Sequence, residues 1–119
     1  MDIIIQGELP DLNTYINAER SNKYVAAKIK KEATEFVAWQ VKSLPKITAP
    51  ANYHFHWIVK NKRKDPDNIS FACKFIFDGL QSSGVLINDS MAWVKSIHHT
   101  YSVGDPRVEL TVVDVYSDV

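Results

Sequence analysis

Several features that mark specialised classes of protein are scarce or missing in this chain of 119 residues. It has one cysteine, Cys73, so no internal disulfide can form, and the helical apolar pattern around it indicates a buried thiol rather than a nucleophile. No apolar run approaches the ~20 residues that a membrane span needs. The first residues lack the basic segment of a signal peptide. We therefore expect a cytoplasmic protein with no membrane partner.

An excess of charge of one sign is also missing, because fourteen basic and fourteen acidic side chains cancel. The net charge therefore gives no indication of a nucleic-acid partner, although local basic patches matter more for phosphate contact. Five bases lie between Arg20 and Lys31, where they are equally well explained as the solvated face of a helix. Four more directly precede a pair of aspartates: Lys60, Lys62, Arg63 and Lys64.

Apolar periodicity predicts a single α+β domain spanning residues 1–119, with a mixed sheet of about four strands packed against helices. Alternating or β-branched residues predict strands at 2–6, 52–60, 91–103 and about 108–112. Helical spacing predicts helices at 22–43 and 68–82. We expect the turn at 104–106 to join the last two strands into a C-terminal hairpin, which gives the order β-α-β-α-β-β.

The segment Lys64-Asp65-Pro66-Asp67-Asn68 is the strongest candidate for a functional site. Pro66 pushes the residue before it into extended backbone, so two carboxylates lie on a short stiff segment at the start of a helix. A divalent cation such as Mg²⁺ relieves their repulsion most simply. Asp89 follows the same helix. We expect Asp65, Asp67 and Asp89 to converge on one metal site.

Carboxylates that hold a hard cation beside a basic stretch suit a phosphodiester substrate. Lys74 would add positive charge as the transition state forms, and Asp78 lies one turn further along the same helix. A turn with capping side chains and an ordinary Lys74–Asp78 ion pair are an alternative explanation of the same residues. A calcium loop of the EF-hand type is excluded, since the sixth and twelfth positions from Asp65 hold Ser70 and Ile76 instead of Gly and Glu.

Two histidines lie close together in the strand predicted at residues 52–60. His54 and His56 share one face of that strand. Two imidazoles can bind a metal, but no third soft ligand lies nearby in the sequence. We interpret both histidines as surface residues of the sheet.

Three motifs resemble, in order, those of one known family. They are Lys-Asp-Pro-Asp-Asn-Ile at 64–69, Lys-Phe-Ile-Phe-Asp-Gly-Leu at 74–80 and Gly-Val-Leu-Ile-Asn-Asp at 84–89. This series is similar to the RusA family of Holliday junction resolvases, and the resemblance covers nearly the whole chain. It implies a dimeric endodeoxyribonuclease, of a kind often carried by phages and prophages. Such an enzyme uses Mg²⁺, or Mn²⁺ in its place, to resolve four-way DNA junctions in recombination and repair.

By position, the resemblance also implies roles for individual residues. Asp65, Asp67 and Asp89 match the metal-binding aspartates and Lys74 the catalytic lysine, with Asp78 in a supporting role. The DNA-contacting segments would supply Asn13, Thr14, Lys60, Lys62, Arg63, Lys64 and Asn68. One departure concerns Lys74, which comes seven residues after Asp67, whereas the family's shorter form places its lysine four residues after the second aspartate.

A symmetric homodimer follows from the same activity, because a junction must be cut on two opposed strands and one chain offers residues for one site. Five aromatics off the predicted core stripes are candidates for the subunit interface or, alternatively, for the monomer core: Trp39, Phe71, Phe75, Phe77 and Trp93. Two other classes of function remain open. One is a DNA-binding or interaction module with a vestigial acidic site, and the other is a metal phosphoesterase that acts on another nucleic acid.

Overall fold

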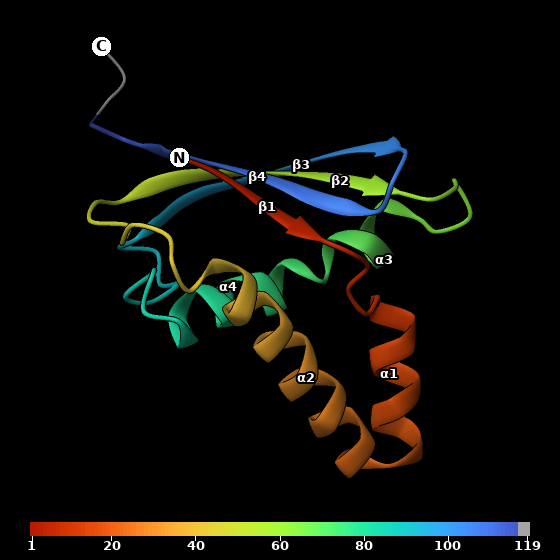
Figure 1. Cartoon of the computed structure of the whole chain (residues 1–119). Helices are drawn as coiled ribbons and strands as arrows, with labels where there is room; N and C mark the ends of the chain where they lie inside the picture. Colours follow the sequence, from red (N-terminus) through yellow and green to blue (C-terminus); the bar gives the residue numbers. More distant parts are fainter. Residues whose placement is uncertain (117–119) are drawn as a thin grey trace.

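A mixed four-stranded sheet organises the fold, and the helices cover one of its faces (Figure 1). The structure is a computed structural model that describes residues 1–116. In chain order the elements are β1 (Asp2–Gln6), α1 (Leu12–Ser21), α2 (Lys23–Val41), β2 (Ala51–Val59), α3 (Pro66–Ser70), α4 (Cys73–Ser82), β3 (Val94–Val103) and β4 (Arg107–Asp114). The predicted α+β class and the mixed sheet of four strands are confirmed.

The predicted C-terminal hairpin is wrong, because β3 and β4 are not neighbours. The strand order is β1-β4-β2-β3, with β4 antiparallel to both β1 and β2 and β3 parallel to β2. The turn at 104–106 instead crosses the end of β2, where Gly104 N–H donates to Val59 O over 2.9 Å. A Cβ on Gly104 would lie 3.0 Å from Ile58 Cγ2, so the close crossing favours a residue without a side chain. The turn itself was predicted correctly, but periodicity does not say which strands pair.

Two helical regions also differ from expectation. The segment after Pro10 forms the ten-residue helix α1, whose N-cap is Asp11: its Oδ1 accepts the Thr14 N–H over 2.8 Å. The helix predicted at 68–82 is divided into α3 and α4 by a turn at 71–72. The long helix predicted at 22–43 is confirmed as α2. No helix among residues 1–116 is long and apolar enough to cross a membrane.

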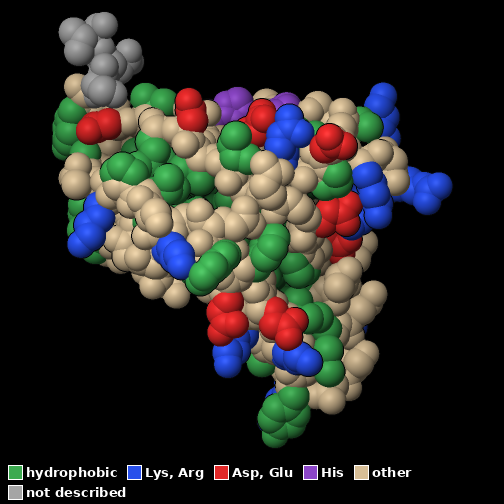
Figure 2. All heavy atoms as spheres, viewed as in Figure 1, with side chains coloured by type: hydrophobic (Ala, Val, Ile, Leu, Met, Phe, Trp, Pro, Cys, Tyr) green, Lys and Arg blue, Asp and Glu red, His purple; other side chains and the backbone are tan. Residues whose placement is uncertain are grey.

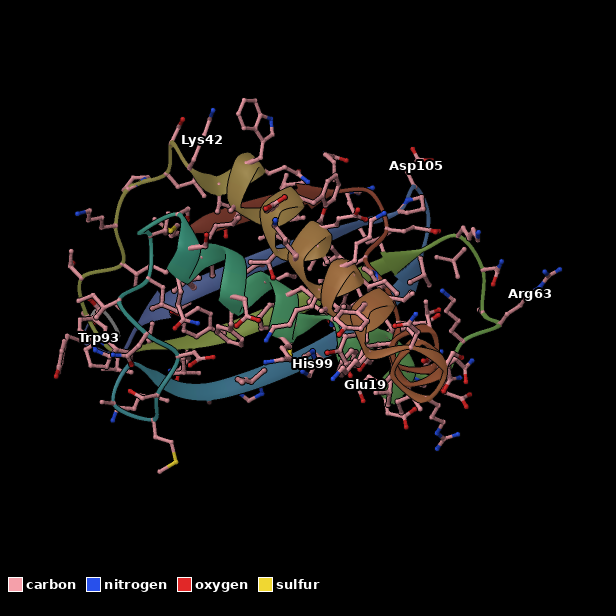
Figure 3. All side chains as sticks on the ribbon, turned by 90° about the horizontal axis from the view of Figure 1, so that it is seen from below. Glu19, Lys42, Arg63, Trp93, His99 and Asp105 are labelled. Atoms are coloured by element: carbon pink, nitrogen blue, oxygen red, sulfur yellow. The ribbon has the colours of Figure 1, made fainter. Side chains whose placement is uncertain are left out.

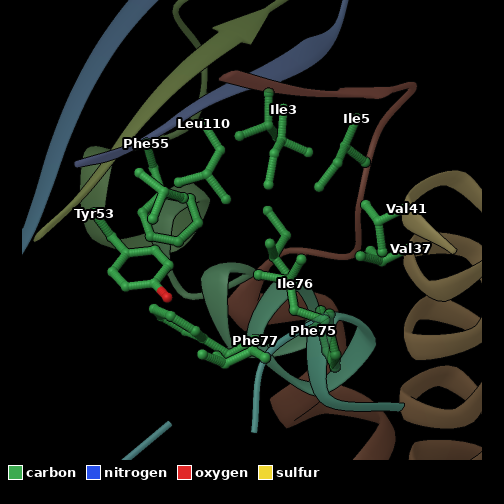
Figure 4. Close-up of a cluster of buried hydrophobic side chains, with 14 of the residues drawn as sticks. Ile3, Ile5, Val37, Val41, Tyr53, Phe55, Phe75, Ile76, Phe77 and Leu110 are labelled. Carbon is green, nitrogen blue, oxygen red and sulfur yellow. The ribbon is translucent and has the colours of Figure 1, made fainter. Parts of the chain in front are cut away.

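The core lies between the sheet and the pair α2 and α4 (Figure 4). Tyr53 and Phe55 of β2 are fully buried there, as their alternation predicts. Phe75 and Phe77 are 0% and 5% exposed, so they belong to the monomer core and are not available to an interface. Both are buried because α4 is covered on two sides, by the sheet and by α2. The packing of α2 on α4 is so close that a Cβ at Gly79 would lie 2.5 Å from a Val37 side-chain carbon.

Candidate functional site

The segments predicted to contact DNA lie side by side at one end of the sheet, where β2 leads into α3 and α1 begins. Asn13 N–H donates to Asn68 Oδ1 over 2.9 Å, and this links the first turn of α1 to α3. Lys64 Nζ lies 2.7 Å from Asp11 Oδ2 and forms a second link between the same segments. Asn68 is 9% exposed, so its amide is a structural part of this junction. Residues 11–14 and 60–68 therefore form one surface.

Asp65 and Asp67 present their carboxylates to solvent on this surface. Asp65 has φ −75° and ψ 154°, the extended backbone that Pro66 imposes, and its side chain makes no capping hydrogen bond. Asp67 Oδ1 accepts only the N–H of the next residue, over 3.0 Å. Within residues 1–116 neither carboxylate forms an ion pair. Two carboxylates with free oxygens, separated by one residue in the chain, suit a hard cation that keeps water in its remaining positions.

The basic residues beside these carboxylates fall into two groups. Lys64 is bound to Asp11, and Lys60 Nζ lies 3.7 Å from a Glu8 carboxylate oxygen, so two of the four charges are partly neutralised. Lys62 and Arg63 are exposed and form no ion pair with any residue between 1 and 116. Figure 2 shows blue and red side chains gathered at this end of the molecule. Lys62 and Arg63 are therefore the bases best placed to contact phosphate.

Asp11 has two structural roles that were not predicted from the sequence. It caps α1 and holds Lys64, although neither role was expected of it. Partial burial raises the pKa of Asp11, but hydrogen bonds from Lys64 and Thr14 more than offset this, so its pKa lies below the ordinary value. An aspartate directly before a helical segment is a recognisable N-cap signal, and it could have predicted the start of α1.

Asp89 does not join this site, and the expected convergence of three aspartates within one chain is wrong. Asp65 and Asp67 follow the C-terminal end of β2, whereas Asp89 precedes the N-terminal end of β3, which runs parallel to β2. The nine residues of β2 span about 26 Å between those ends. Figure 3 shows the separation, since Arg63 and Trp93 lie at opposite ends of the sheet. No group of three His, Cys, Asp or Glu within residues 1–116 could hold a metal ion.

Lys74 and Asp78 form a separate pair on α4. Lys74 Nζ lies 3.7 Å from Asp78 Oδ2, a distance that allows an ion pair but not a hydrogen bond. Asp78 Oδ2 is buried, and no hydrogen-bond donor reaches it from the described part of the chain. The structure thus agrees with the ordinary ion pair considered above. The turn at 71–72 also means that Lys74 and Asp67 do not lie on one continuous helix.

The histidines of the sheet are engaged with hydroxyl groups. Both His54 Nε2 and His56 Nδ1 lie 2.7 Å from Thr100 Oγ1, and His56 Nε2 lies 2.9 Å from Ser102 Oγ. These side chains lie on the sheet face opposite the core, which confirms that the two histidines are surface residues. On the helix side, Trp57 Nε1–H donates to His99 Nδ1 over 2.9 Å.

No protein-family model and no curated protein matches the chain. The similarity to the RusA family therefore rests on the sequence motifs, their order, and the agreement of Asn13-Thr14-Tyr15 and the last strand with that family.

Proposed function

We propose that this protein is a structure-selective endodeoxyribonuclease of the RusA type, which cuts four-way DNA junctions with Mg²⁺ or Mn²⁺ in recombination and repair. The observation that carries the proposal is the pair of exposed carboxylates, Asp65 and Asp67, on a stiff turn next to the unpaired bases Lys62 and Arg63. A cation and a phosphodiester are the partners that satisfy both sets of charge. The activity would belong to the cytoplasm.

The residues of this end of the sheet have distinct roles in the proposed reaction. Asp65 and Asp67 would hold the cation, which when bound activates water and polarises the phosphoryl group. Lys62 and Arg63 bind flanking phosphates and orient the strand. The hydrogen bond from Asn13 to Asn68 keeps the carboxylates in a fixed position relative to α1.

Lys74 and Asp78, the separate pair on α4, also have roles in the proposed reaction. We assign to Lys74 the stabilisation of negative charge on the reacting phosphate, and to Asp78 the positioning of its ammonium group. The ammonium of Lys74 is exposed, so it can face a phosphate while it stays 3.7 Å from the buried Asp78 Oδ2, which no hydrogen-bond donor reaches from the described part of the chain.

Cleavage of a labelled four-way junction, with and without Mg²⁺, tests the proposal directly. Asp65→Asn and Asp67→Asn should remove most cleavage and leave junction binding intact or tighter, because each carboxylate attracts the cation but repels the phosphate when no cation is present. Asp2→Asn is the matched control, since Asp2 is also exposed but lies in β1. Equal loss of binding and cleavage would contradict a catalytic role for these aspartates.

A junction-binding module without catalysis is the second candidate function. The position of Asp89, at the other end of the sheet from Asp65, favours it, because one chain then lacks a complete set of acids. This candidate predicts a gel shift with the junction and no nicking at any concentration of Mg²⁺ or Mn²⁺.

A further inference from the structure

The helical hairpin formed by α1 and the first half of α2 extends away from the rest of the molecule (Figure 1). Its outer part, residues 16–31, is the arm. Asn22 alone joins the two helices: its N–H donates to Ala18 O over 2.8 Å, and its Oδ1 accepts the Tyr24 N–H over 2.9 Å. Asn22 therefore caps both helices, and hydrogen bonds fix the turn at the tip of the arm.

The exposed surface of the arm is basic. Five bases and no acid lie between residues 20 and 31. Lys28 forms an ion pair with Glu32 over 3.8 Å. The other four bases are exposed and form no ion pair within residues 1–116: Arg20, Lys23, Lys30 and Lys31. An ordinary solvated helix face carries charges of both signs, so these four uncompensated charges point to a polyanionic partner.

An exposed aromatic ring lies among these bases. Tyr24 is the second residue of α2 and is 74% exposed. Lys23 Nζ lies 5.4 Å from the centre of its ring. Lys31 follows Tyr24 by seven residues, which places it on the same side of α2 and about 10 Å away. Aromatic rings beside cations are the groups on which exposed nucleic-acid bases stack.

A membrane surface is the other polyanion that basic helices bind. A helix that lies on a membrane needs a free apolar face. The apolar face of α2 is not free, because Ala26, Ala33 and Val37 are 3%, 5% and 0% exposed. DNA binds through phosphate charge and base stacking and needs no such face, so it fits the arm better.

The helix α1 connects the arm to the candidate site. The first turn of α1 is hydrogen-bonded to α3 through Asn13 and Asn68, and its ten residues span about 15 Å. Each strand of B-DNA carries one phosphate per ~3.4 Å of helix axis. DNA held at Asp65 and Asp67 would therefore come within reach of the tip about four base pairs away.

From these observations we infer that the arm binds branched DNA, with Tyr24 stacked on a base that the branch point exposes. The four unpaired bases of the arm contact phosphates. The inference rests on the function proposed above and adds how a branch is distinguished from linear duplex. A metal site can hydrolyse the phosphodiester of either DNA, whereas a base face is exposed only where the base stack is interrupted. Tyr24 thus selects the substrate and takes no part in the chemistry.

Binding of labelled DNA in EDTA tests the phosphate contacts without any need for cleavage. Lys30→Ala/Lys31→Ala should weaken binding to a four-way junction and to linear duplex alike. The slope of log K against log salt concentration should become less steep by about 2, because two phosphate contacts are lost. Lys46→Ala/Lys95→Ala is the matched control, since both lysines are exposed and unpaired within residues 1–116 but lie outside the arm. An unchanged slope, or the same change in the control, overturns the phosphate contacts.

The same assay tests the role of Tyr24. Tyr24→Ala should weaken junction binding at least about fivefold and leave both the salt slope and binding to linear duplex unchanged, because a stacked ring is lost and no charge is. Tyr24→Phe keeps the ring and should bind like wild type. Trp39→Ala is the control, because Trp39 is 71% exposed on α2 but lies outside the arm. Equal weakening on linear duplex, or a Tyr24→Phe protein as weak as Tyr24→Ala, overturns the stacking.

Nicking and lipid binding separate this inference from the proposed function. If wild type cuts the junction and the arm variants bind and cut it equally well, the arm inference is wrong and the function stands. If wild type binds the junction through the arm but never cuts it, the arm inference stands and the nuclease activity is wrong. Binding to phosphatidylserine vesicles that Tyr24→Ala abolishes, with DNA binding unchanged, would identify a membrane as the partner and overturn the inference.

Discussion

Replacement of Gly79 by alanine should destabilise the protein, although alanine is the better helix former. An added Cβ would lie 2.5 Å from Val37 Cγ1, 2.6 Å from Val37 Cβ and 3.0 Å from Ala38 N. Carbon atoms pack best at about 3.5–4.0 Å, so α2 and α4 would have to separate by about 1 Å. Overpacking of this kind costs about 1–3 kcal/mol, which exceeds the gain of about 1 kcal/mol in helix propensity.

Urea and thermal unfolding measure this effect. We expect Gly79→Ala to lower the free energy of unfolding by about 2 kcal/mol at the midpoint, because overpacking outweighs propensity. For a chain of 119 residues this corresponds to a fall in Tm of about 8 °C. Gly84→Ala is the control: Gly84 has φ +81° and no atom within 4 Å of an added Cβ, so its cost comes from backbone strain alone, about 1 kcal/mol.

A double variant checks the cause. Val37→Ala removes Cγ1, which would lie 2.5 Å from the Cβ added at position 79, but leaves Val37 Cβ, which would lie 2.6 Å from it. The variant should therefore relieve part of the clash. The Gly79→Ala/Val37→Ala protein should be at least about 1 kcal/mol more stable than the two single losses predict when added together. Strict additivity, or a Gly79→Ala protein as stable as wild type, would refute the packing argument.

Three further predictions concern the hydrogen bonds described above. Burial, together with the charges of His54 and His98, lowers the pKa of His99 below 6.5, so His99 binds a proton more tightly in the unfolded chain than in the folded one. The free energy of unfolding should therefore fall as the pH drops below about 6.5. Urea titrations at several pH values should show that His99→Phe removes the contribution of His99 to this fall. Lys64→Met should raise the pKa of Asp11, which an NMR titration would show, because the variant removes the Lys64 hydrogen bond. The variant should lower the free energy of unfolding by less than about 1 kcal/mol, and wild type and variant should become equally stable as acid protonates Asp11. Asn68→Ala should cost about 1–2 kcal/mol by thermal unfolding, because the N–H bound to Asn68 Oδ1 loses its acceptor; an unchanged Tm would show that water replaces it.

The sequence by itself determined the local features of this protein. Alternation of apolar residues was enough to locate the core strand β2, because each residue of a strand faces the opposite side from the next. Pro66 was enough to predict extended backbone at Asp65, because its ring excludes the helical conformation of the residue before it. The pair of exposed carboxylates beside a basic segment was also visible in the sequence, since all of these residues are close together in the chain.

Only the tertiary structure decided which distant segments meet. The sequence placed Asp89 with Asp65, but parallel pairing of β3 with β2 sends it to the other end of the sheet. The sequence analysis also left Phe75 and Phe77 outside the core. One helical stripe predicts one buried face, whereas α2 and the sheet cover α4 from two sides. The physical reason is the same in both cases. Backbone hydrogen bonds between strands are nearly independent of side-chain identity, so the choice of partner depends on how the whole set of elements buries its apolar faces.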